Sequence, residues 1–531
     1  MRNECVAGLF TLAVVMVLSG CRAGNYPEPV PPVTVNRTYE KVDPSPAVVA
    51  DFYDLRLKID TEKDCLVETV SMDIQNNTDS LVDTVYLRYN PMGYFDYLRE
   101  ANPEAAGANR DKGAEITSIR FEGEDKELTA EYLLDGTSVK IGLADDAIEP
   151  GEKRTLIVDS WTDIPDVEDR FGMLRRDEGK LYALALCFPY IDCSCDGMWQ
   201  IDPPLYLGGG GENRNPNLKD YHVEIDVPEQ FEVACAGVSV RKGGTVLVDL
   251  ENIRDFAVVV SDFMDVDTFE TQGVTIRNYY LRTGDIEAYK EISKQTIIDS
   301  FEFYTGLLGN YQRKEYSMAQ YVDGMEYSGF AVVDGRNLMN GGPDNGNKLM
   351  RNTAHEAGHS WFYDAVGNNE YNEGWIDEGI ISYLASYELV LNDIESYKTE
   401  KKYGSDWTLK DQTNALKKSN ALLEENQLKP LDHCYLNTPW HEYPENSGPG
   451  SKEYIYAPIF LSHAKEIMGE EAFYSFLKEV YQTYAMKIVH SEDILEILRK
   501  YDNSSKMNEL IAFYFSGAKE NMKEKQNETA L

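Results

Sequence analysis

The sequence is poor in basic residues. It has 51 Lys and Arg against 91 Asp and Glu, which gives a formal net charge of −40 over 531 residues. Proteins that bind nucleic acid or anionic lipid through their charge need a basic surface. The composition therefore argues against nucleic acid as a partner, and a solvated acidic surface accounts for the surplus of carboxylates.

The N-terminus lacks an apolar run long enough to span a membrane. Its apolar segment, Val6 to Leu18, has 13 residues, whereas a membrane-spanning helix needs about 20. Arg2 precedes this segment, and small residues follow it up to Cys21. This order of a basic residue, a short apolar run and small residues indicates an export signal over residues 1–21.

The tetrapeptide LSGC at residues 18–21 resembles a bacterial lipobox. The resemblance implies cleavage before Cys21 and lipidation of its thiol. A plain signal peptide with an incidental cysteine is the alternative. Residues 22–46 then form a proline-rich tether. We expect an exported protein that is lipid-anchored to the bacterial cell membrane or outer membrane and faces outside the cytoplasm.

Cysteine is also sparse, with eight residues in the chain. If Cys5 is removed with the signal and Cys21 is lipidated, six remain: Cys65, Cys187, Cys193, Cys195, Cys235 and Cys434. These could pair in an oxidising exterior, but their connectivity does not follow from sequence. Cys193-Ser194-Cys195 lacks the second cysteine pair of a zinc site. A local disulfide and free thiols both stay open.

Two kinds of periodicity divide the chain. Residues 47–266 contain short alternating apolar segments separated by turn residues, a pattern typical of a β-sandwich-like domain. Residues 267–519 are mainly helical in pattern, and residues 520–531 form a charged tail. The clearest predicted helices are 285–308, 380–391, 458–468, 472–481 and 491–501. The fold class expected is multidomain α+β.

Histidine is scarce too, with seven residues, yet two of them lie in one pentapeptide, HEAGH at residues 355–359. Because His355 and His359 are four positions apart, a helix projects both from the same face. Two imidazoles in this arrangement bind Zn²⁺ at about 2.0–2.1 Å each. Glu356 lies on the adjacent face, where its carboxylate can take a proton from water at the metal.

A third ligand is expected from Glu378, which follows His359 after 18 residues in the segment WIDEG, residues 375–379. At the start of the next helix, Glu378 could approach the histidine pair from a neighbouring element. The spacing makes this arrangement plausible. The predicted cofactor is one Zn²⁺ per chain, held by His355, His359 and Glu378.

The motifs together resemble those of the aminopeptidase N family of gluzincin zinc metallopeptidases. HEAGHSWF from residue 355, VGNN from residue 366 and WIDEG from residue 375 follow the zinc signature of that family. GMEYSG from residue 324 is similar to its exopeptidase motif, GxMEN, with Tyr327 in place of Asn. The resemblance covers about residues 50–519. It implies a saddle-like N-terminal β domain followed by a thermolysin-like, mainly helical catalytic domain.

The resemblance also implies roles for single residues. Glu326 would bind the free α-amine of a peptide, while Gly324 and Met325 would border the site of the first residue. The segment YIYAP from residue 454 is similar to the one that carries the family's catalytic tyrosine. Tyr454 would donate a hydrogen bond to the oxyanion, and Tyr456 is the competing choice.

One departure concerns the end of the sequence. The chain ends soon after IAFYFSG at residues 511–517, whereas larger members of the resembled family continue into a C-terminal helical domain. We therefore expect a more open cleft. The leading hypothesis is a zinc-dependent aminopeptidase that releases N-terminal residues from extracytoplasmic peptides with a free N-terminus. The alternatives are an open-cleft zinc endopeptidase of the same fold and a catalytically silent, peptide-binding surface lipoprotein.

Overall fold

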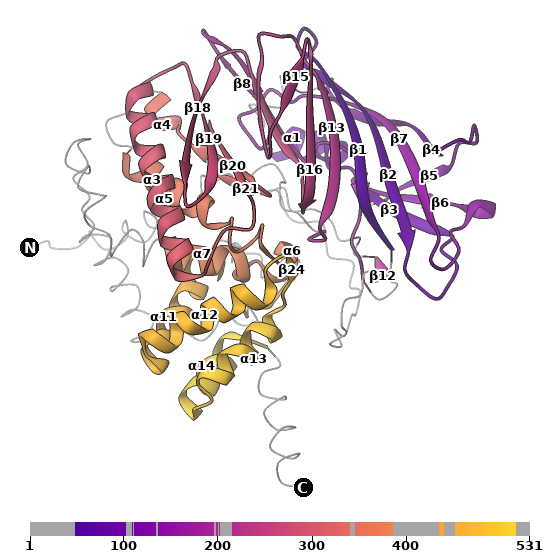
Figure 1. Cartoon of the computed structure of the whole chain (residues 1–531). Coiled ribbons are helices and arrows are strands. Elements are labelled where there is room, and N and C mark those ends of the chain that lie inside the picture. The colour runs from indigo at the N-terminus through magenta and orange to yellow at the C-terminus, as the bar shows by residue number, and fades with distance from the viewer. Residues whose placement is uncertain are drawn as a thin grey trace, which may run out of the picture. The chain divides into compact units, whose positions relative to one another are not determined.

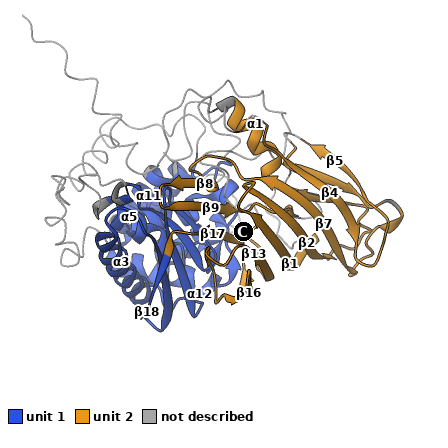
Figure 2. Cartoon of the chain, turned by 90° about the horizontal axis from the view of Figure 1, so that it is seen from above, with its two compact units in different colours: residues 1–20, 265–531 blue, residues 21–264 orange. Residues whose placement is uncertain are grey.

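The computed structural model describes residues 48–101, 109, 111–133, 136–195, 198–199, 201, 215–339, 346–385, 435–439 and 452–516. The chain forms two compact units that meet in sequence between Met264 and Asp265 (Figure 2). Unit 2 contains the described residues up to 264, and unit 1 contains those from 265 onward. The predicted lipidation site Cys21, the tether and the charged tail lie outside the described residues.

Unit 2 is built from β-sheets. Its largest sheet has seven strands in the order β15-β16-β13-β1-β2-β7-β4. The strands are β15 (Val240–Lys242), β16 (Thr245–Ile253), β13 (Lys219–Asp226), β1 (Val48–Asp60), β2 (Cys65–Asn76), β7 (Lys153–Asp163) and β4 (Ala114–Phe121). Buried and partly exposed residues alternate along β2 and β7. This alternation is the period-two pattern of the sequence, because successive side chains of a strand point to opposite faces.

Three smaller sheets complete unit 2, with strand orders β14-β17-β9-β8, β10-β3-β6-β5 and β11-β12. Their strands are β14 (Glu232–Cys235), β17 (Ala257–Ser261), β9 (Gly179–Ala185), β8 (Phe171–Arg176), β10 (Tyr190–Ile191), β3 (Thr84–Arg88), β6 (Ser138–Gly142), β5 (Thr129–Leu133), β11 (Ser194–Cys195) and β12 (Met198–Trp199). Two short helices, α1 (Pro91–Ala101) and η2 (Ala144–Asp146), connect strands. Strand β17 differs from β2 and β7, because all five of its residues are buried.

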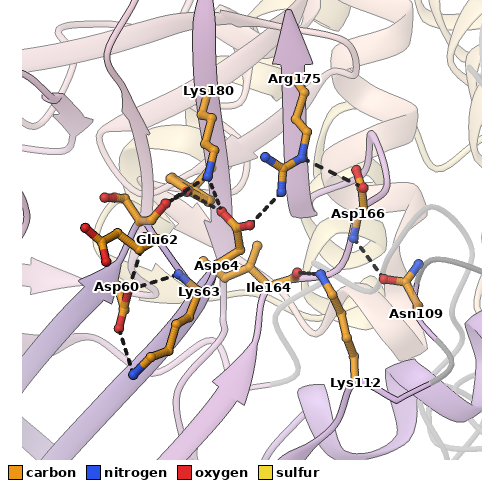
Figure 3. Close-up of polar contacts among 12 residues, drawn as sticks. Asp60, Glu62, Lys63, Asp64, Asn109, Lys112, Ile164, Asp166, Arg175 and Lys180 are labelled. Atoms are coloured by element: carbon orange, nitrogen blue, oxygen red, sulfur yellow. Dashed lines mark hydrogen bonds and ion pairs between the residues drawn. The ribbon is translucent and has the colours of Figure 1, made fainter.

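A polar cluster stabilises unit 2 around Asp64, at the turn between β1 and β2 (Figure 3). Its carboxylate accepts hydrogen bonds from Arg175 at 2.5 Å, Lys180 at 2.9 Å and Tyr182 at 2.6 Å. Burial by itself would raise the pKa of Asp64, but these three donors outweigh it and lower the pKa. The carboxylate therefore stays ionised and ties the turn to the hairpin of β8 and β9.

Unit 1 begins with a five-stranded sheet in the order β18-β19-β20-β22-β21. The strands are β18 (Met264–Thr271), β19 (Val274–Leu281), β20 (Glu315–Tyr321), β22 (Phe330–Asp334) and β21 (Met325–Tyr327). Helices α3 (Ile286–Leu307) and α5 (Gly346–Gly358) pack against each other and against this sheet (Figure 1). The predicted helix over 285–308 is α3, and the Asp285 carboxylate caps it by accepting from Ala288 N at 3.0 Å.

Most of the other described residues of unit 1 belong to helices. They are α4 (Arg336–Met339), α6 (Glu370–Glu373), η3 (Trp375–Gly379), α7 (Ile380–Tyr383), η7 (Lys452–Tyr456), α11 (Ala457–Met468), α12 (Glu470–Tyr484), α13 (Ser491–Tyr501) and α14 (Ser505–Tyr514). A short parallel pair, β23 (Val366–Gly367) and β24 (Lys487–Ile488), joins distant segments. Of the predicted helix 380–391, the described part is α7, and the remainder lies outside the described residues.

The core of unit 1 contains a cluster of aromatic rings beneath α5. Trp361 stacks on Tyr304 with ring centroids 5.1 Å apart, and Phe301 meets Trp361 edge to face at 5.2 Å. The indole nitrogen of Trp361 donates to the Gly309 carbonyl at 2.8 Å, so its polar atom is satisfied although the ring is buried. This packing holds the end of α5 against α3.

Sheets in the N-terminal part and mostly helices in the C-terminal part confirm the predicted α+β class. Among the described helices, none combines the length and the apolar character needed to cross a membrane. Cys65 and Cys187 are free thiols, so neither forms the local disulfide left open above. Cys434 lies outside the described residues.

Candidate metal centre

The histidine motif lies at the C-terminal end of α5, within the core of unit 1. His355 and Glu356 belong to the last turn of the helix, and His359 continues it, its N–H donating to the His355 carbonyl at 3.3 Å. His359 is 1 % exposed, whereas the His355 side chain retains 18 %. The helix thus presents both imidazoles on one face, as their spacing predicts.

Glu378 comes from η3 and meets both imidazoles. Its Oε2 lies 2.9 Å from His355 Nε2 and 3.6 Å from His359 Nε2, and the two Nε2 atoms are 3.1 Å apart. The structure therefore brings together the three residues that the sequence predicts as ligands.

The spacing of these three atoms fits a zinc ion. Ligands at about 2.0–2.1 Å in a tetrahedral site lie roughly 3.3 Å from one another. The three separations of 2.9, 3.1 and 3.6 Å bracket that value. Two imidazole nitrogens and one carboxylate oxygen are also ligand types that zinc prefers, with a fourth position open in catalytic sites.

The protonation of the site suits metal binding. His359 Nδ1 lies 3.1 Å from the Phe362 carbonyl oxygen, so Nδ1 carries the proton and donates it. Nε2 is then the ring atom directed at the ligand cluster. Burial by itself would lower the pKa of His359, but Glu326, Glu378 and Glu356 outweigh it and raise that pKa, so metal binding at Nε2 would release a proton. Burial by itself would raise the pKa of Glu378, but His355 and His359 outweigh it and hold that pKa well below its usual range. Glu378 is therefore an anionic candidate ligand.

Glu356 is 6 % exposed and lies beside the ligand cluster. One of its carboxylate oxygens lies within 4.8 Å of a His359 ring nitrogen and of a Glu326 oxygen. Gly324 makes room for it, because a Cβ at that position would overlap Glu356 Oε1. Glycine at the start of the GMEY segment thus lets the Glu356 carboxylate lie where it does, and a larger residue there would move that carboxylate.

Tyr454 lies on η7, and its hydroxyl donates to Glu378 Oε1. Burial raises the pKa of this phenol, and the Glu378 charge adds to the effect, so Tyr454 keeps its proton. It is therefore suited to donate a hydrogen bond and not to act as a base. Tyr456, the competing choice, packs against the hydrophobic core of unit 1.

Glu326 and Met325 belong to the edge strand β21, which pairs with β22. Glu326 is 4 % exposed and joins Glu356 and His359 in the group described above. Met325 is buried. Its side chain lies on the opposite face of β21 from that of Glu326, because successive side chains of a strand point to opposite faces. Tyr327, which departs from the resembled motif, stacks on Phe330 with ring centroids 5.9 Å apart.

The structure adds acidic residues that sequence reasoning did not single out. Oxygens of Glu326, Glu370 and Asp377 all lie within 4.8 Å of one another, and all three side chains are buried. Burial raises the pKa of Asp377, and the neighbouring Glu378 charge raises it further. Asp377 could have been noticed as the neighbour of Glu378, but no sequence pattern marks Glu370, which α6 brings to the cluster.

Comparison with known proteins supports this assignment. Residues 314–514 match the model of the peptidase family M1 domain. That range contains the three ligand candidates as well as Glu326, Glu356 and Tyr454. No curated protein matches the sequence.

Solved structures share the fold. A crystal structure of an M1 zinc metallopeptidase from Deinococcus radiodurans superposes with a TM-score of 0.56 at 13 % identity, covering 89 % of this chain and 94 % of that one. A mutant of that enzyme bound to a Tyr-Ser-Ala substrate gives the same TM-score and identity, covering 89 % and 95 %. A two-domain M1 zinc metallopeptidase mutant bound to L-arginine gives 0.56 at 12 % identity, covering 88 % and 94 %. At such identities the likeness concerns the fold.

Proposed function

We propose that this protein, whose residues 314–514 match the peptidase family M1 domain, is a zinc-dependent aminopeptidase. It would release single residues from the free N-termini of extracytoplasmic peptides. The observation that carries the zinc assignment is the cluster of His355 Nε2, His359 Nε2 and Glu378 Oε2, with separations between 2.9 and 3.6 Å.

Each residue around the cluster has a separate role in the proposed reaction. A zinc ion held by the three ligands supplies Lewis-acid chemistry that makes water a nucleophile near neutral pH. Glu356 accepts the proton of the attacking water and passes it to the leaving amine. Tyr454 donates a hydrogen bond to the peptide oxygen as negative charge develops there. The raised pKa of Tyr454 supports this role, since the phenol remains protonated.

In this proposal Glu326 binds the N-terminal amine of the peptide and so fixes which peptide bond lies at the zinc ion. Its carboxylate lies in the same 4.8 Å group as Glu356 and His359, so a substrate amine bound there is close to the reacting bond. A charge-assisted hydrogen bond to a carboxylate favours a free ammonium over an acetylated nitrogen. Cleavage would therefore fall after the first residue.

A peptide series with free and acetylated N-termini tests the proposal. The zinc-loaded protein should cleave the free peptides one residue at a time and spare the acetylated ones. Glu326→Ala should lower kcat/KM about 10²-fold or more on free peptides, through loss of a charged hydrogen bond and of register. It should have little effect on any residual cleavage of acetylated peptides.

The other hypotheses predict different results. Equal cleavage of both peptide forms would identify an endopeptidase. No cleavage of either form by protein with bound zinc would favour a peptide-binding protein. Equal losses on both forms in Glu326→Ala would remove Glu326 from the amine site.

We also propose export and lipid anchoring through Cys21. The support is the LSGC segment and the short apolar run before it. Expression in a bacterial host with a radiolabelled fatty acid should label the wild-type chain and not the Cys21→Ser variant. A labelled variant, or an unlabelled wild-type chain, would contradict the lipid anchor.

A further inference from the structure

The third ligand candidate lies where the helical geometry changes along the chain. Glu378 is in η3, a π-helix of five residues that follows the four-residue helix α6 and continues directly into α7. A π-helical turn is rare, and most of the stability of a protein helix comes from tertiary packing. His355 and His359, by contrast, are carried by the 13-residue α5 and its end. The position of Glu378 therefore depends on what packs against residues 366–379.

The connection between α12 and α13 supplies that contact through its backbone. Met486 N donates to the Ala365 carbonyl at 2.7 Å, and Val489 N donates to the Gly367 carbonyl at 2.8 Å. Strands β23 and β24 pair between these two bonds. We call residues 486–491 the C-terminal brace. It runs beside the start of the segment that leads to Glu378.

Side chains extend the brace to η3. Glu373, at the end of α6, accepts from Ser491 N at 2.7 Å through Oε1 and lies 2.8 Å from His490 Nδ1 through Oε2. Trp375, the first residue of η3, donates from its indole nitrogen to Ser491 Oγ at 2.8 Å. Burial by itself would raise the pKa of Glu373, but His490 and Ser491 outweigh it and lower the pKa. An ionised carboxylate thus anchors the start of η3.

Packing makes the anchor stiff. Trp375 is fully buried and meets Phe460 and Phe515 edge to face, with centroids 6.2 and 5.0 Å away. The Glu378 N–H donates to the Gly374 carbonyl at 3.1 Å, so a shift of Gly374 carries over to the ligand. Residues 373 and 375 are both bound by the brace and flank Gly374.

We propose that Glu373 and His490 are positioning residues for the zinc ligand Glu378. The inference rests on the zinc ligands of the proposed function. Neither residue belongs to the ligand cluster, and their effect passes through η3. Metal–ligand distances in proteins lie within about 0.2 Å of standard values, so a ligand that is held less firmly should bind the metal more weakly. Changes to partners that orient a ligand typically cost 10–100-fold in metal affinity or activity.

Two variants and a rescue test the proposal. Glu373→Ala removes the carboxylate, and His490→Leu removes its imidazole partner. His490→Asn is the conservative variant, because the Asn amide can place a donor near the position of Nδ1. His490 N, which donates to Asp493 at 3.0 Å, is a backbone group and is kept in both His490 variants. The His490 side chain also belongs to the capping box of α13, so Glu373→Ala, which leaves that box intact, separates the effect on η3 from the effect on the cap.

Glu479→Ala is the matched control. Glu479 lies on α12 and binds Lys500 at 2.5 Å and Tyr501 at 2.8 Å on α13. The control therefore removes a carboxylate that has two hydrogen-bond partners. It joins α12 to α13, the two helices that the brace connects, and it lies away from η3. It reports the effect of a general loosening of the C-terminal helices.

The measurements are zinc affinity by competition with a chromophoric chelator, the visible spectrum of the cobalt-substituted protein, and kcat and KM. Glu373→Ala and His490→Leu should bind zinc 10–100-fold more weakly and show an altered cobalt spectrum. His490→Asn should recover most of the affinity, and Glu479→Ala should match the wild type. Wild-type affinity and spectrum in Glu373→Ala and His490→Leu would overturn the proposal, as would equal losses in Glu479→Ala. Failure of the wild-type chain to bind zinc would instead overturn the proposed function.

Discussion

Glu356 shows how neighbours decide the role of one carboxylate. It is buried beside the ligand cluster, and Gly324 leaves the space that its carboxylate occupies. In the proposed function, this side chain lies where the attacking water must lose a proton.

Replacing this base while keeping the ligands separates catalysis from metal binding. Glu356→Gln should bind zinc like the wild type and lose about 10²–10⁴-fold in kcat, because an amide cannot accept the proton. Metal analysis and steady-state kinetics check both parts. Glu302→Gln, at an exposed position of α3, serves as the control. Normal turnover in Glu356→Gln would contradict the assigned mechanism.

Glu68 shows burial acting without a catalytic role. It is 1 % exposed on β2 of unit 2 and accepts from the Ser160 hydroxyl. Burial raises its pKa to about 8, which outweighs the lowering by Ser160 and Tyr89. The folded protein therefore favours the neutral carboxyl over the carboxylate.

This shift predicts a pH dependence of stability. Because the folded pKa is raised, the folded state binds the proton more tightly than the unfolded state. The free energy of unfolding should then fall as pH rises from about 4.5 to about 8, by up to about 1.4 kcal/mol per pH unit. Glu68→Gln lacks this proton and should lose less stability over the same range. Denaturant unfolding of both proteins at pH 5.5 and pH 8 measures the difference, and parallel losses would show that Glu68 does not titrate as described.

At the scale of elements, the site depends on how closely η3 and η7 approach. A Cβ at Gly379 would overlap the Cβ of Ala457, which follows η7 directly. Gly379 has φ −70° and ψ −44°, so alanine is permitted by the backbone and excluded by the neighbour. Glycine here brings the element of Glu378 against the element of Tyr454.

Moving one methyl group between the two elements tests this contact. Gly379→Ala should cost about 1–3 kcal/mol of stability through overpacking, and it should lower kcat by displacing Tyr454 from Glu378. The double variant Gly379→Ala/Ala457→Gly should recover much of both, because it restores the total volume. Thermal unfolding and kinetics measure the two effects. Additive losses in the double variant would show that the two positions do not share this contact.

At the scale of the whole molecule, the two units respond to different perturbations. All the proposed zinc ligands lie in unit 1 and Glu68 lies in unit 2. A ligand stabilises the state that binds it, by about 2.7 kcal/mol at 100 times its Kd. Zinc should therefore add stability to unit 1.

Zinc removal should expose that difference. Chelation should lower hydrogen-exchange protection in α5 and η3, while protection in β1 and β2 stays unchanged. Hydrogen-exchange mass spectrometry resolves these segments in the intact chain. Restoring zinc should restore protection, and restoring magnesium should not, because magnesium prefers oxygen ligands. Equal losses in β1 and β2 would show that the stability provided by zinc is not confined to unit 1.

Local patterns determined much of what could be predicted. The strands of unit 2 follow from the alternation of apolar and polar residues. Helices α3 and α13 match the predicted spans, because helix caps and apolar periodicity depend on residues that are close in sequence. The ligand pair His355 and His359 follows from the geometry of one helical turn. The identification of Glu378 needed the resemblance of longer motifs as well as spacing.

Tertiary structure decided what depends on distant segments. Tyr454 and Tyr456 differ by two positions, and only the fold shows that Tyr454 meets Glu378 while Tyr456 packs against the core. The contact of His490 with Glu373 joins residues 117 positions apart in sequence. Such contacts form because buried polar groups must find partners when elements pack. The sequence by itself therefore determined the candidate ligand types and the helix that carries the two histidines, because both are local properties. Packing decided which other side chains reach the candidate metal centre.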